Sequence, residues 1–390
     1  MLLCDGSLIS NLMGFAFDEN RNVESIMRVS ALRVGFFALV ALSATLPTTG
    51  CRPTDKPSGP ASAQEVVRLN GGGATFVNPL VQKWSQAYKD KAQIDYSGTG
   101  SGAGIKQMAE QTLDFGCSDA PMSKKEAEAA VAKNGDVVHI PVTIGAVAMV
   151  YNLPGIDEPI KFSGAVIADI YLGKITKWND PALAALNEGV ALPNTDIVPV
   201  YRSEGSGTTN IFTEYLSKSS PDFAKKIGIS KAPKWPKIGV GQNGSDGVAG
   251  HVQKNPGCIG YVEIYYAKQN KIPFGSVRNK AGKDVLPESK SVTAAAVEAM
   301  KEKQTKEPYT LHELTYSLTD AAGEGSYPIS GMSYALLYKS QPAVKGRALV
   351  EFLKWATTEG QEFAEGLEYA PLPAELRKSI GVRLGAVEFK

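Results

Sequence analysis

The chain has few of the residues that most often carry catalysis or bind metals. Its 390 residues include three histidines and four cysteines. His139, His251 and His312 lie far apart in the sequence and no CxxC pair occurs, so a metal site has little support. Only Cys117 and Cys258 lie in the body of the chain, each within an apolar, strand-like run. We therefore expect two small buried thiols rather than a disulfide, and no cofactor.

An excess of charge of one sign is also absent. Lysine and arginine total 41 against 40 aspartate and glutamate, and no block is rich in basic residues. A nucleic-acid-binding protein would need a clustered basic face, so that class has no support. Hydrophobic residues at 43% and charged residues at 21% are typical of a globular protein long enough for two domains. Any anion site must then rest on local positive potential.

The N-terminal region lacks a hydrophobic run long enough to span a membrane. The apolar run at 34–46, VGFFALVALSATL, follows Arg28 and Arg33, whereas a span needs about 20 apolar residues. This pattern is typical of a signal peptide, which we assign to residues 1–50. Met27 is an alternative start of the chain.

Residues 48–51 read TTGC and resemble the lipobox of bacterial lipoproteins. In that motif the cysteine, here Cys51, is lipidated, although Thr48 stands where leucine is usual. The alternative is ordinary signal cleavage nearby, which would give a free secreted protein. The Pro- and Ser-rich segment 51–64 is predicted to be a flexible tether.

Beyond residue 65, short apolar runs alternate with amphipathic stretches, which predicts an α/β fold. Strands are expected at 66–71, 93–98, 113–118, 137–152, 197–202, 258–264 and 332–339. Helices are expected at 77–90, 103–111, 123–133, 209–218, 245–254, 291–302 and 343–358.

Four loops rich in glycine and hydroxyl residues each join an expected strand to an expected helix. They read GGGATFVNP (71–79), YSGTGSGAG (96–104), SDAPMS (118–123) and YRSEGSGTTN (201–210). Helix N-termini offer unpaired N–H groups and the positive end of a dipole. Singly, such loops can simply cap helices, as Ser123 is expected to do. Together, and with Arg202 and Asp119 among them, they indicate convergence on one anion.

Other interpretations of the glycine-rich loops have weaker support. Residues 98–103 and 239–244 both fit the dinucleotide pattern G-x-G-x-x-[G/A], which shows how unspecific that pattern is here. No P-loop sequence occurs. Ser101 and Ser206 are flanked by glycine, but neither stands in G-x-S-x-G and no histidine base can be assigned. An exported phosphoester hydrolase is the alternative from another functional class.

The donors in these loops suit a tetrahedral oxyanion. Arg202 would supply the one formal positive charge, because its planar fork fits two oxygens at once. Glu204 would hold the guanidinium group of Arg202 in place. The alternative is that the two form a surface ion pair that contributes little to stability. Hydroxyl donors would come from Thr75, Ser101, Ser206 and Thr208.

Asp119 is the unexpected member of this set, because a carboxylate repels an anion and is costly when buried. It becomes useful only where the anion brings a proton for it to accept. Hydrogen phosphate carries such a proton and sulfate does not, and a site of this kind rejects the analogue that lacks it by about 10⁴–10⁵-fold. The alternative is that Asp119 merely caps the following helix.

From about residue 66 to the C-terminus the sequence resembles the periplasmic phosphate-binding proteins of bacterial high-affinity phosphate ABC transporters, which belong to the type II periplasmic binding protein family. The matching stretches include GGGATFVNPLVQKW, DFGCSDAP, DIYLGKITKWND, RSEGSGTTNIFTEYL, GSDGVAGHVQ, IGYVEIYYAKQN and LEYAPLP. The family's best-known pattern has Asp where this chain has Glu204. The resemblance implies that phosphate is bound by Thr75, Phe76 through its N–H group, Ser101, Asp119, Arg202, Ser206, Gly207 and Thr208.

The resemblance also implies a two-lobed periplasmic-binding-protein fold with a two-segment hinge and a central ligand cleft. Lobe I is expected at 65–150 and 331–390, and lobe II at 151–330. The implied function is that of a non-catalytic, extracytoplasmic solute-binding protein for phosphate transport, which closes over its ligand and docks on a membrane permease. A phosphate sensor or scavenger without a permease is the alternative within the binding class.

Overall fold

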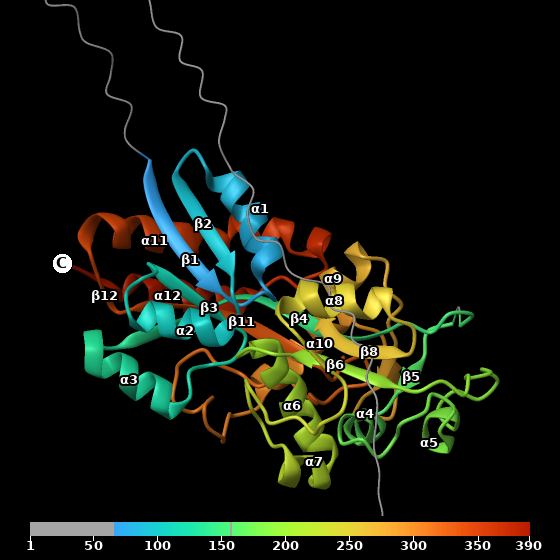
Figure 1. Ribbon diagram of the computed structural model, residues 1–390. Coiled ribbons are helices and arrows are strands. Elements are labelled where there is room, and N and C mark those ends of the chain that lie inside the picture. Colours follow the sequence, from blue (N-terminus) through green and yellow to red (C-terminus); the bar gives the residue numbers. More distant parts are fainter. Residues whose placement is uncertain (1–65, 157) are drawn as a thin grey trace, which may run out of the picture. The chain divides into compact units, whose positions relative to one another are not determined.

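The computed structural model describes residues 66–156 and 158–390, so the predicted signal peptide, tether and lipidation site at Cys51 lie outside the described residues. Within the described part of the chain, an eight-stranded mixed sheet has the strand order β2-β1-β3-β11-β4-β8-β6-β7. Figure 1 shows helices on both faces of this sheet. The structure is therefore of the α/β class that the sequence predicts.

One half of the sheet is built from parallel strands, namely β1 (Val67–Gly73), β2 (Ala92–Gly98) and β3 (Phe115–Ser118). The helices of this half are α1 (Asn78–Tyr88), α2 (Ser101–Ala109), α3 (Lys124–Asn134), α11 (Ala343–Ala356) and α12 (Ala374–Gly385). Parallel strands need crossover connections, and α1 (β1 to β2) and α2 (β2 to β3) supply them. In Figure 1, α1 and α11 lie on one side of β1 and β2, and α2 lies on the other.

The other half is also parallel, with β6 (Val198–Arg202) between β7 (Val240–Gln242) and β8 (Cys258–Glu263). Its helices are α4 (Gly164–Tyr171), α5 (Pro181–Ala184), α6 (Gly207–Ser219), α7 (Pro221–Lys226), α8 (Gly244–Lys254), α9 (Ile264–Gln269) and α10 (Ser289–Lys301). A small sheet of β5 (Lys161–Phe162), β9 (Ser276–Arg278) and β10 (Asp284–Val285) accompanies them.

Two long antiparallel strands, β4 (Val137–Tyr151) and β11 (Ser330–Tyr338), connect the two halves. The first part of β4, up to Ala146, pairs with β11, and the part from Val147 onward pairs with β8. Apart from its first residue, every residue of β4 is buried, in agreement with the continuous apolar run predicted as a strand. The register shifts beside Pro141, where a proline is tolerated because the ladder is already interrupted.

The register brings the carboxyl ends of both sets of parallel strands toward the middle of β4. Ser118, at the end of β3, lies opposite Tyr334, which in turn lies opposite Pro141. Glu263, at the end of β8, lies opposite Val147. Ligands in open α/β sheets bind outside the carboxyl ends of the strands. Here two such ends face a shared region beside residues 141–147.

The predicted strands and helices are all present, with shifted ends. Helices α2 and α6 begin at Ser101 and Gly207, two residues earlier than predicted, because their glycine-rich starts carry no apolar period. Helices α4, α5, α7, α9 and α12 were not predicted. The remaining short elements are β12 (Ser340–Gln341), β13 (Glu388–Phe389) and the 3-10 turns Glu359–Phe363 and Glu365–Leu367.

A further sequence prediction concerns burial and is confirmed. Cys117 and Cys258 are both buried free thiols. In α1 the side chains of Leu80, Trp84 and Tyr88 face the core, as their four-residue spacing predicts.

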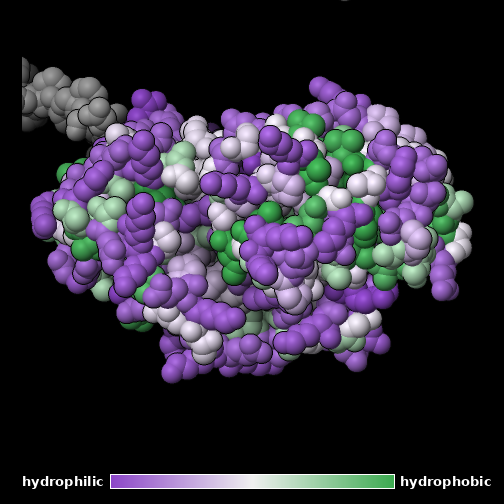
Figure 2. Space-filling view, turned by 60° about the horizontal axis from the view of Figure 1, so that its bottom comes forward, coloured by the Kyte–Doolittle hydropathy of each residue, from purple (hydrophilic) through white to green (hydrophobic). Residues whose placement is uncertain are grey.

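The face in Figure 2 is mainly hydrophilic, with hydrophobic residues in separate patches. None of the described helices is both long and apolar enough to cross a membrane.

Candidate functional site

The site residues predicted from the sequence lie at the carboxyl ends of the parallel strands. Thr75 and Phe76 follow β1, and Ser101 begins α2 just after β2. Asp119 follows β3 directly. In the other half, Arg202 ends β6, and the loop after it leads into α6 at Gly207. The strand–loop–helix order seen in the sequence therefore places all of these loops beside the middle of β4.

The N-termini of α2 and α6 contact each other through Ser101. Its Oγ accepts hydrogen bonds from the N–H groups of Gly207, at 3.0 Å, and of Asp119, at 3.3 Å. A Cβ atom on Gly207 would lie 2.6 Å from both that Oγ and the Asp119 nitrogen. Position 207 therefore needs glycine, because any side chain would force the two helices apart.

Asp119 is buried between the two halves of the sheet, with 3% of its surface exposed. Its Oδ1 accepts a hydrogen bond from Ser333 Oγ at 2.9 Å, and its Oδ2 accepts one from Thr208 Oγ1 at 3.3 Å. Burial raises the pKa of Asp119 to about 7, although the hydrogen bond from Ser333 and the charge of Arg202 oppose that shift. The helix that follows is capped by Ser123, with Glu126 completing a capping box. The alternative role of Asp119 as a helix cap is therefore wrong.

Arg202 holds a buried positive charge, since 1% of its side chain is exposed. Its Nε donates to Glu204 Oε1 at 2.7 Å, and its Nη2 donates to the same oxygen. Its Nη1 donates to Ser245 Oγ at 3.2 Å. Glu204 Oε1 also accepts the N–H of Gly244 at 3.2 Å, while Oε2 has no hydrogen-bond partner among the described residues. Arg202 is buried and Glu204 is only partly exposed, so the interpretation as a weak, fully exposed surface ion pair is wrong.

The loop after β1 meets the second half of the sheet through hydroxyl contacts. Thr75 Oγ1 lies 2.9 Å from Ser245 Oγ, at the start of α8. The carbonyl oxygen of Thr75 accepts a hydrogen bond from Tyr266 at 2.6 Å, and that of Phe76 accepts one from Tyr369 at 2.6 Å. The side chains of Thr75 and Phe76 are both buried. The loop is therefore held on two sides by groups from distant parts of the chain.

Ser206 differs from the other predicted site residues. Its Oγ accepts the N–H of Thr209 at 3.1 Å, which makes it the N-cap of α6. Its own N–H donates to the carbonyl oxygen of Lys231 at 2.9 Å. The hydroxyl is 1% exposed and lies one residue before Gly207. Ser206 thus fixes the start of α6, and among the described residues its hydroxyl accepts a hydrogen bond but donates none.

Sequence reasoning missed Ser245 and Ser333. Ser245 is the second residue of α8, just after β7, and the glycine-rich stretch 239–244 before it fits the dinucleotide pattern, so the sequence gives no separate sign of an anion site there. Ser333 gives a fainter signal, as one of two serines within the apolar strand β11. Its position opposite Thr143 in the register brings it to Asp119.

The structure brings two of the histidines together beside Met122, near the end of the loop 118–123. The rings of His139 and His312 stack with their centroids 3.9 Å apart, and both contact the backbone of Met122. Burial lowers the pKa of each, so both are neutral near pH 7. Among the described residues, no group of three or more His, Cys, Asp or Glu side chains could hold a metal ion.

Comparison with known proteins identifies the family. The PBP superfamily domain matches residues 57–359. The phosphate-binding protein PstS of Xylella fastidiosa (strain Temecula1) is 38% identical over 371 residues, which cover 91% of this chain and 98% of that protein. The chain belongs to the PstS phosphate-binding proteins of the PBP superfamily. PstS of Pasteurella multocida is 40% identical over 317 residues, covering 80% of this chain and 88% of that protein.

Solved structures agree in fold. A high-affinity periplasmic phosphate-binding protein with bound phosphate has a TM-score of 0.66 at 20% identity, covering 81% of this chain and 93% of that one. A phosphate-binding protein from Stenotrophomonas maltophilia has a TM-score of 0.62 at 19% identity, covering 81% and 94%. The predicted two-lobed periplasmic-binding-protein fold and the family resemblance are both confirmed.

Proposed function

We propose that this chain is an extracytoplasmic solute-binding protein that captures inorganic phosphate between two lobes and delivers it to the permease of a phosphate ABC transporter. The relatives named phosphate-binding protein support the ligand. The observation that carries the proposal is the position of one buried carboxyl group, that of Asp119, among the donors of the site loops. Arg202 supplies the buried positive charge that an anion needs.

The proposed ligands are those of the sequence prediction. They are Thr75, Phe76 through its N–H group, Ser101, Asp119, Arg202, Ser206, Gly207 and Thr208. Hydrogen bonds that join members of this set across the two halves support it, such as those from Gly207 to Ser101 and from Thr208 to Asp119. Glu204 supports the guanidinium of Arg202 by accepting from two of its nitrogens.

Asp119 selects phosphate over sulfate in this proposal. The carboxyl group already accepts hydrogen bonds on both oxygens, and burial makes an uncompensated negative charge there costly. An anion that donates a proton to this group gains a hydrogen bond, whereas fully ionised sulfate brings only repulsion. The expected preference for phosphate over sulfate is about 10⁴–10⁵-fold, as in other sites when the ligand lacks an obligatory hydrogen-bond donor.

The lobes are proposed at 65–150 with 331–390, and at 151–330, and they close over the ligand. The change of partner along β4 after Ala146 and the start of β11 at Ser330 support a two-segment connection. Contacts between the lobes support a closed arrangement: Gly102 N–H donates to the Gly205 carbonyl oxygen at 2.8 Å. An ion pair of 2.6 Å between Lys231 and Glu126 adds to it.

The protein is proposed to be non-catalytic and periplasmic or otherwise extracytoplasmic, with a lipid anchor at Cys51. A serine nucleophile needs a base within hydrogen-bond reach. In the described part of the chain, the contacts of the Ser101 and Ser206 hydroxyls are with backbone N–H groups, not with histidine. This supports binding over the alternative of a phosphoester hydrolase.

Calorimetric titration of the purified chain with phosphate and with sulfate tests the proposal. We expect tight phosphate binding, essentially no sulfate signal, and a reduced difference between the two ions for Asp119→Ala. Equal binding of both ions by the parent would disprove the role of Asp119, and binding of neither would disprove the function. Turnover of a chromogenic phosphoester would favour the hydrolase instead.

A further inference from the structure

Two buried tyrosine hydroxyls contact consecutive backbone carbonyl groups of the loop after β1. Tyr266, in α9, donates to Thr75 O at 2.6 Å, and Tyr369 donates to Phe76 O at 2.6 Å. Tyr266 is 7% exposed and Tyr369 is fully buried. We infer that these tyrosines are positioning residues: they fix the orientation of the two consecutive peptide groups that carry the Phe76 and Val77 N–H, and so the aim of the Phe76 amide at the anion.

The argument rests on the geometry of the peptide group. A trans peptide unit is planar, so its C=O and N–H bonds point in opposite directions. The carbonyl of Thr75 and the N–H of Phe76 belong to one unit, and the carbonyl of Phe76 and the N–H of Val77 belong to the next. A hydroxyl that holds the carbonyl from one side therefore fixes the N–H on the other side. A hydrogen bond to the carbonyl also polarises the unit and strengthens its N–H as a donor.

The two tyrosines differ in where they come from. Under the lobe limits proposed above, Tyr369 and Phe76 belong to the same lobe, so their contact is present whether the lobes are open or closed. Tyr266 belongs to the other lobe from Thr75, so its hydrogen bond forms only on closure. Tyr266 thus couples closure of the lobes to the orientation of the Phe76 N–H group, which is the amide donor in the proposed phosphate site.

A purely structural role for the Tyr266 hydroxyl is the competing explanation. The carbonyl oxygen of Thr75 also accepts the N–H of Asn78, at 3.3 Å. Removal of the tyrosine hydroxyl would therefore not leave that buried carbonyl without a partner, and the large penalty for an unpaired polar group would not arise. The effect of the hydroxyl should appear in ligand binding more than in folding.

Tyr266→Phe and Tyr369→Phe remove only the two hydroxyls, and Tyr338→Phe is the matched control. Tyr338 is buried and its hydroxyl also donates to a carbonyl oxygen, that of Ala109 at 3.0 Å, but away from the site. By calorimetry on the full chain we expect phosphate to bind about tenfold more weakly to Tyr266→Phe and about threefold more weakly to Tyr369→Phe. The control should stay within about twofold of the parent. The loss in Tyr266→Phe should appear as faster dissociation, because the contact belongs to the closed form.

Amide chemical shifts in the phosphate-bound protein separate positioning from general destabilisation. Tyr266→Phe should move the ¹H–¹⁵N resonance of Phe76, and Tyr369→Phe should move that of Val77, each with little effect on the other. This inference rests on the proposed function. If the parent protein does not bind phosphate, the proposed function itself is wrong, whatever the tyrosines do. If the parent binds but Tyr266→Phe matches Tyr338→Phe in affinity, or weakens binding without moving the Phe76 amide, the inference is wrong.

Discussion

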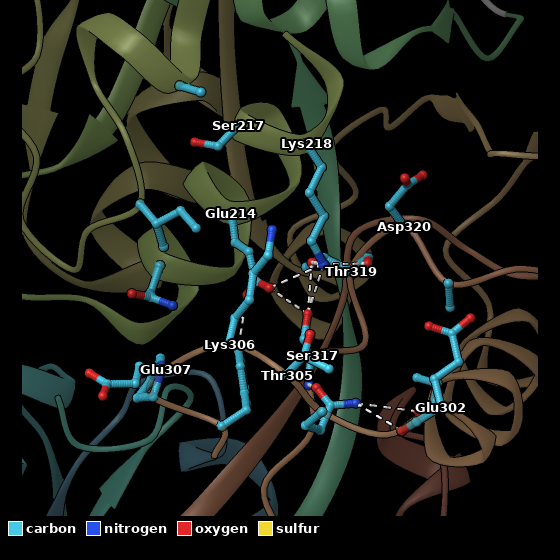
Figure 3. A pocket seen from close by; sticks show the side chains of 18 of the residues that line it. Glu214, Ser217, Lys218, Glu302, Thr305, Lys306, Glu307, Ser317, Thr319 and Asp320 are labelled. Carbon is cyan, nitrogen blue, oxygen red and sulfur yellow. Dashed lines mark hydrogen bonds and ion pairs between the residues drawn. The ribbon is translucent and has the colours of Figure 1, made fainter. Parts of the chain in front are cut away.

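Helix α6 contributes to two polar regions that differ in kind. Its first residues, Gly207 and Thr208, contact Ser101 and Asp119 in the buried site. Later residues of the same helix line a pocket of about 650 Å³ beside α10 and the segment 302–309. This pocket is much the more open of the two regions, and Figure 3 shows several charged side chains around it.

The charges of the pocket balance in number, and one pair of them, Glu214 and Lys218, forms an ion pair. In the described residues its lining holds equal numbers of lysines and acids: Lys218, Lys280, Lys303, Lys306, Glu214, Glu302, Glu307 and Asp320. Figure 3 shows Glu214 and Lys218 directed toward Ser317, and each is hydrogen-bonded to it. Glu214 also accepts from Tyr309 at 2.7 Å. No single ligand chemistry follows from such a lining.

The buried site has fewer charges: Arg202 pairs with Glu204, whereas Asp119 forms no ion pair among the described residues. Asp119 has a pKa raised to about 7 by burial, and Glu204 Oε2 has no hydrogen-bond partner among the described residues. The raised pKa of Asp119, within a cluster of buried hydrogen-bond donors, is the kind of perturbation that points to a functional site. The comparison teaches that a buried carboxyl group without an ion-pair partner, rather than volume, distinguishes the candidate site from the pocket.

The largest effect is expected for Arg202→Met, which removes the buried cation and leaves Glu204 unpaired. Phosphate affinity should fall by about 10²–10³-fold, as for other truncated buried charge pairs. Arg278→Met is the control, since Arg278 forms an exposed pair with Asp284 at 2.9 Å. Calorimetry should show parent-like binding in the control. If Arg202→Met lowers phosphate affinity by less than about threefold, the buried site does not differ from the pocket in the way proposed.

A smaller effect is expected on stability through Asp119. The native pKa of about 7 lies above the ordinary value of 3.8, so between these pH values the native state keeps a proton that the unfolded chain has released. Its contribution is therefore full below about pH 4 and is lost as pH rises through 7. Relative to Asp119→Asn, the ligand-free parent should lose about 2–4 kcal/mol of unfolding free energy over this range. Urea unfolding at several pH values measures this, and parallel curves for the two proteins would contradict it.

The smallest effect on binding is expected for Lys218→Met in the pocket. This change removes the ion pair with Glu214, 3.1 Å long, and hydrogen bonds to Ser317 and Thr319. Tm should fall by about 2 °C, while phosphate affinity stays within about twofold of the parent. A tenfold change in affinity would instead show that α6 couples the pocket to the site.

Much of the fold follows from local sequence patterns. The continuous apolar run that became β4 and the four-residue spacing of Trp84 and Tyr88 in α1 needed no tertiary information. Short elements such as α5 (Pro181–Ala184) were missed because four residues carry no readable period. The sequence pattern predicts the starts of α2 and α6 too late, because glycine and serine are common both at helix N-termini and in loops.

The sequence by itself determined the chemistry of the site: an arginine, a carboxyl group and hydroxyl donors at the starts of helices, in a family that its long matching stretches reveal. Only the tertiary structure decided which groups meet. Ser333 reaches Asp119 from 214 residues away, and Tyr266 reaches Thr75 from 191 residues away. Such pairs arise from the register of β11 and β4 and from the meeting of two sheet ends, and a local pattern holds no record of either. Burial is likewise a property of the assembled fold, and it is burial that turns an ordinary aspartate into a carboxyl group with a pKa of about 7.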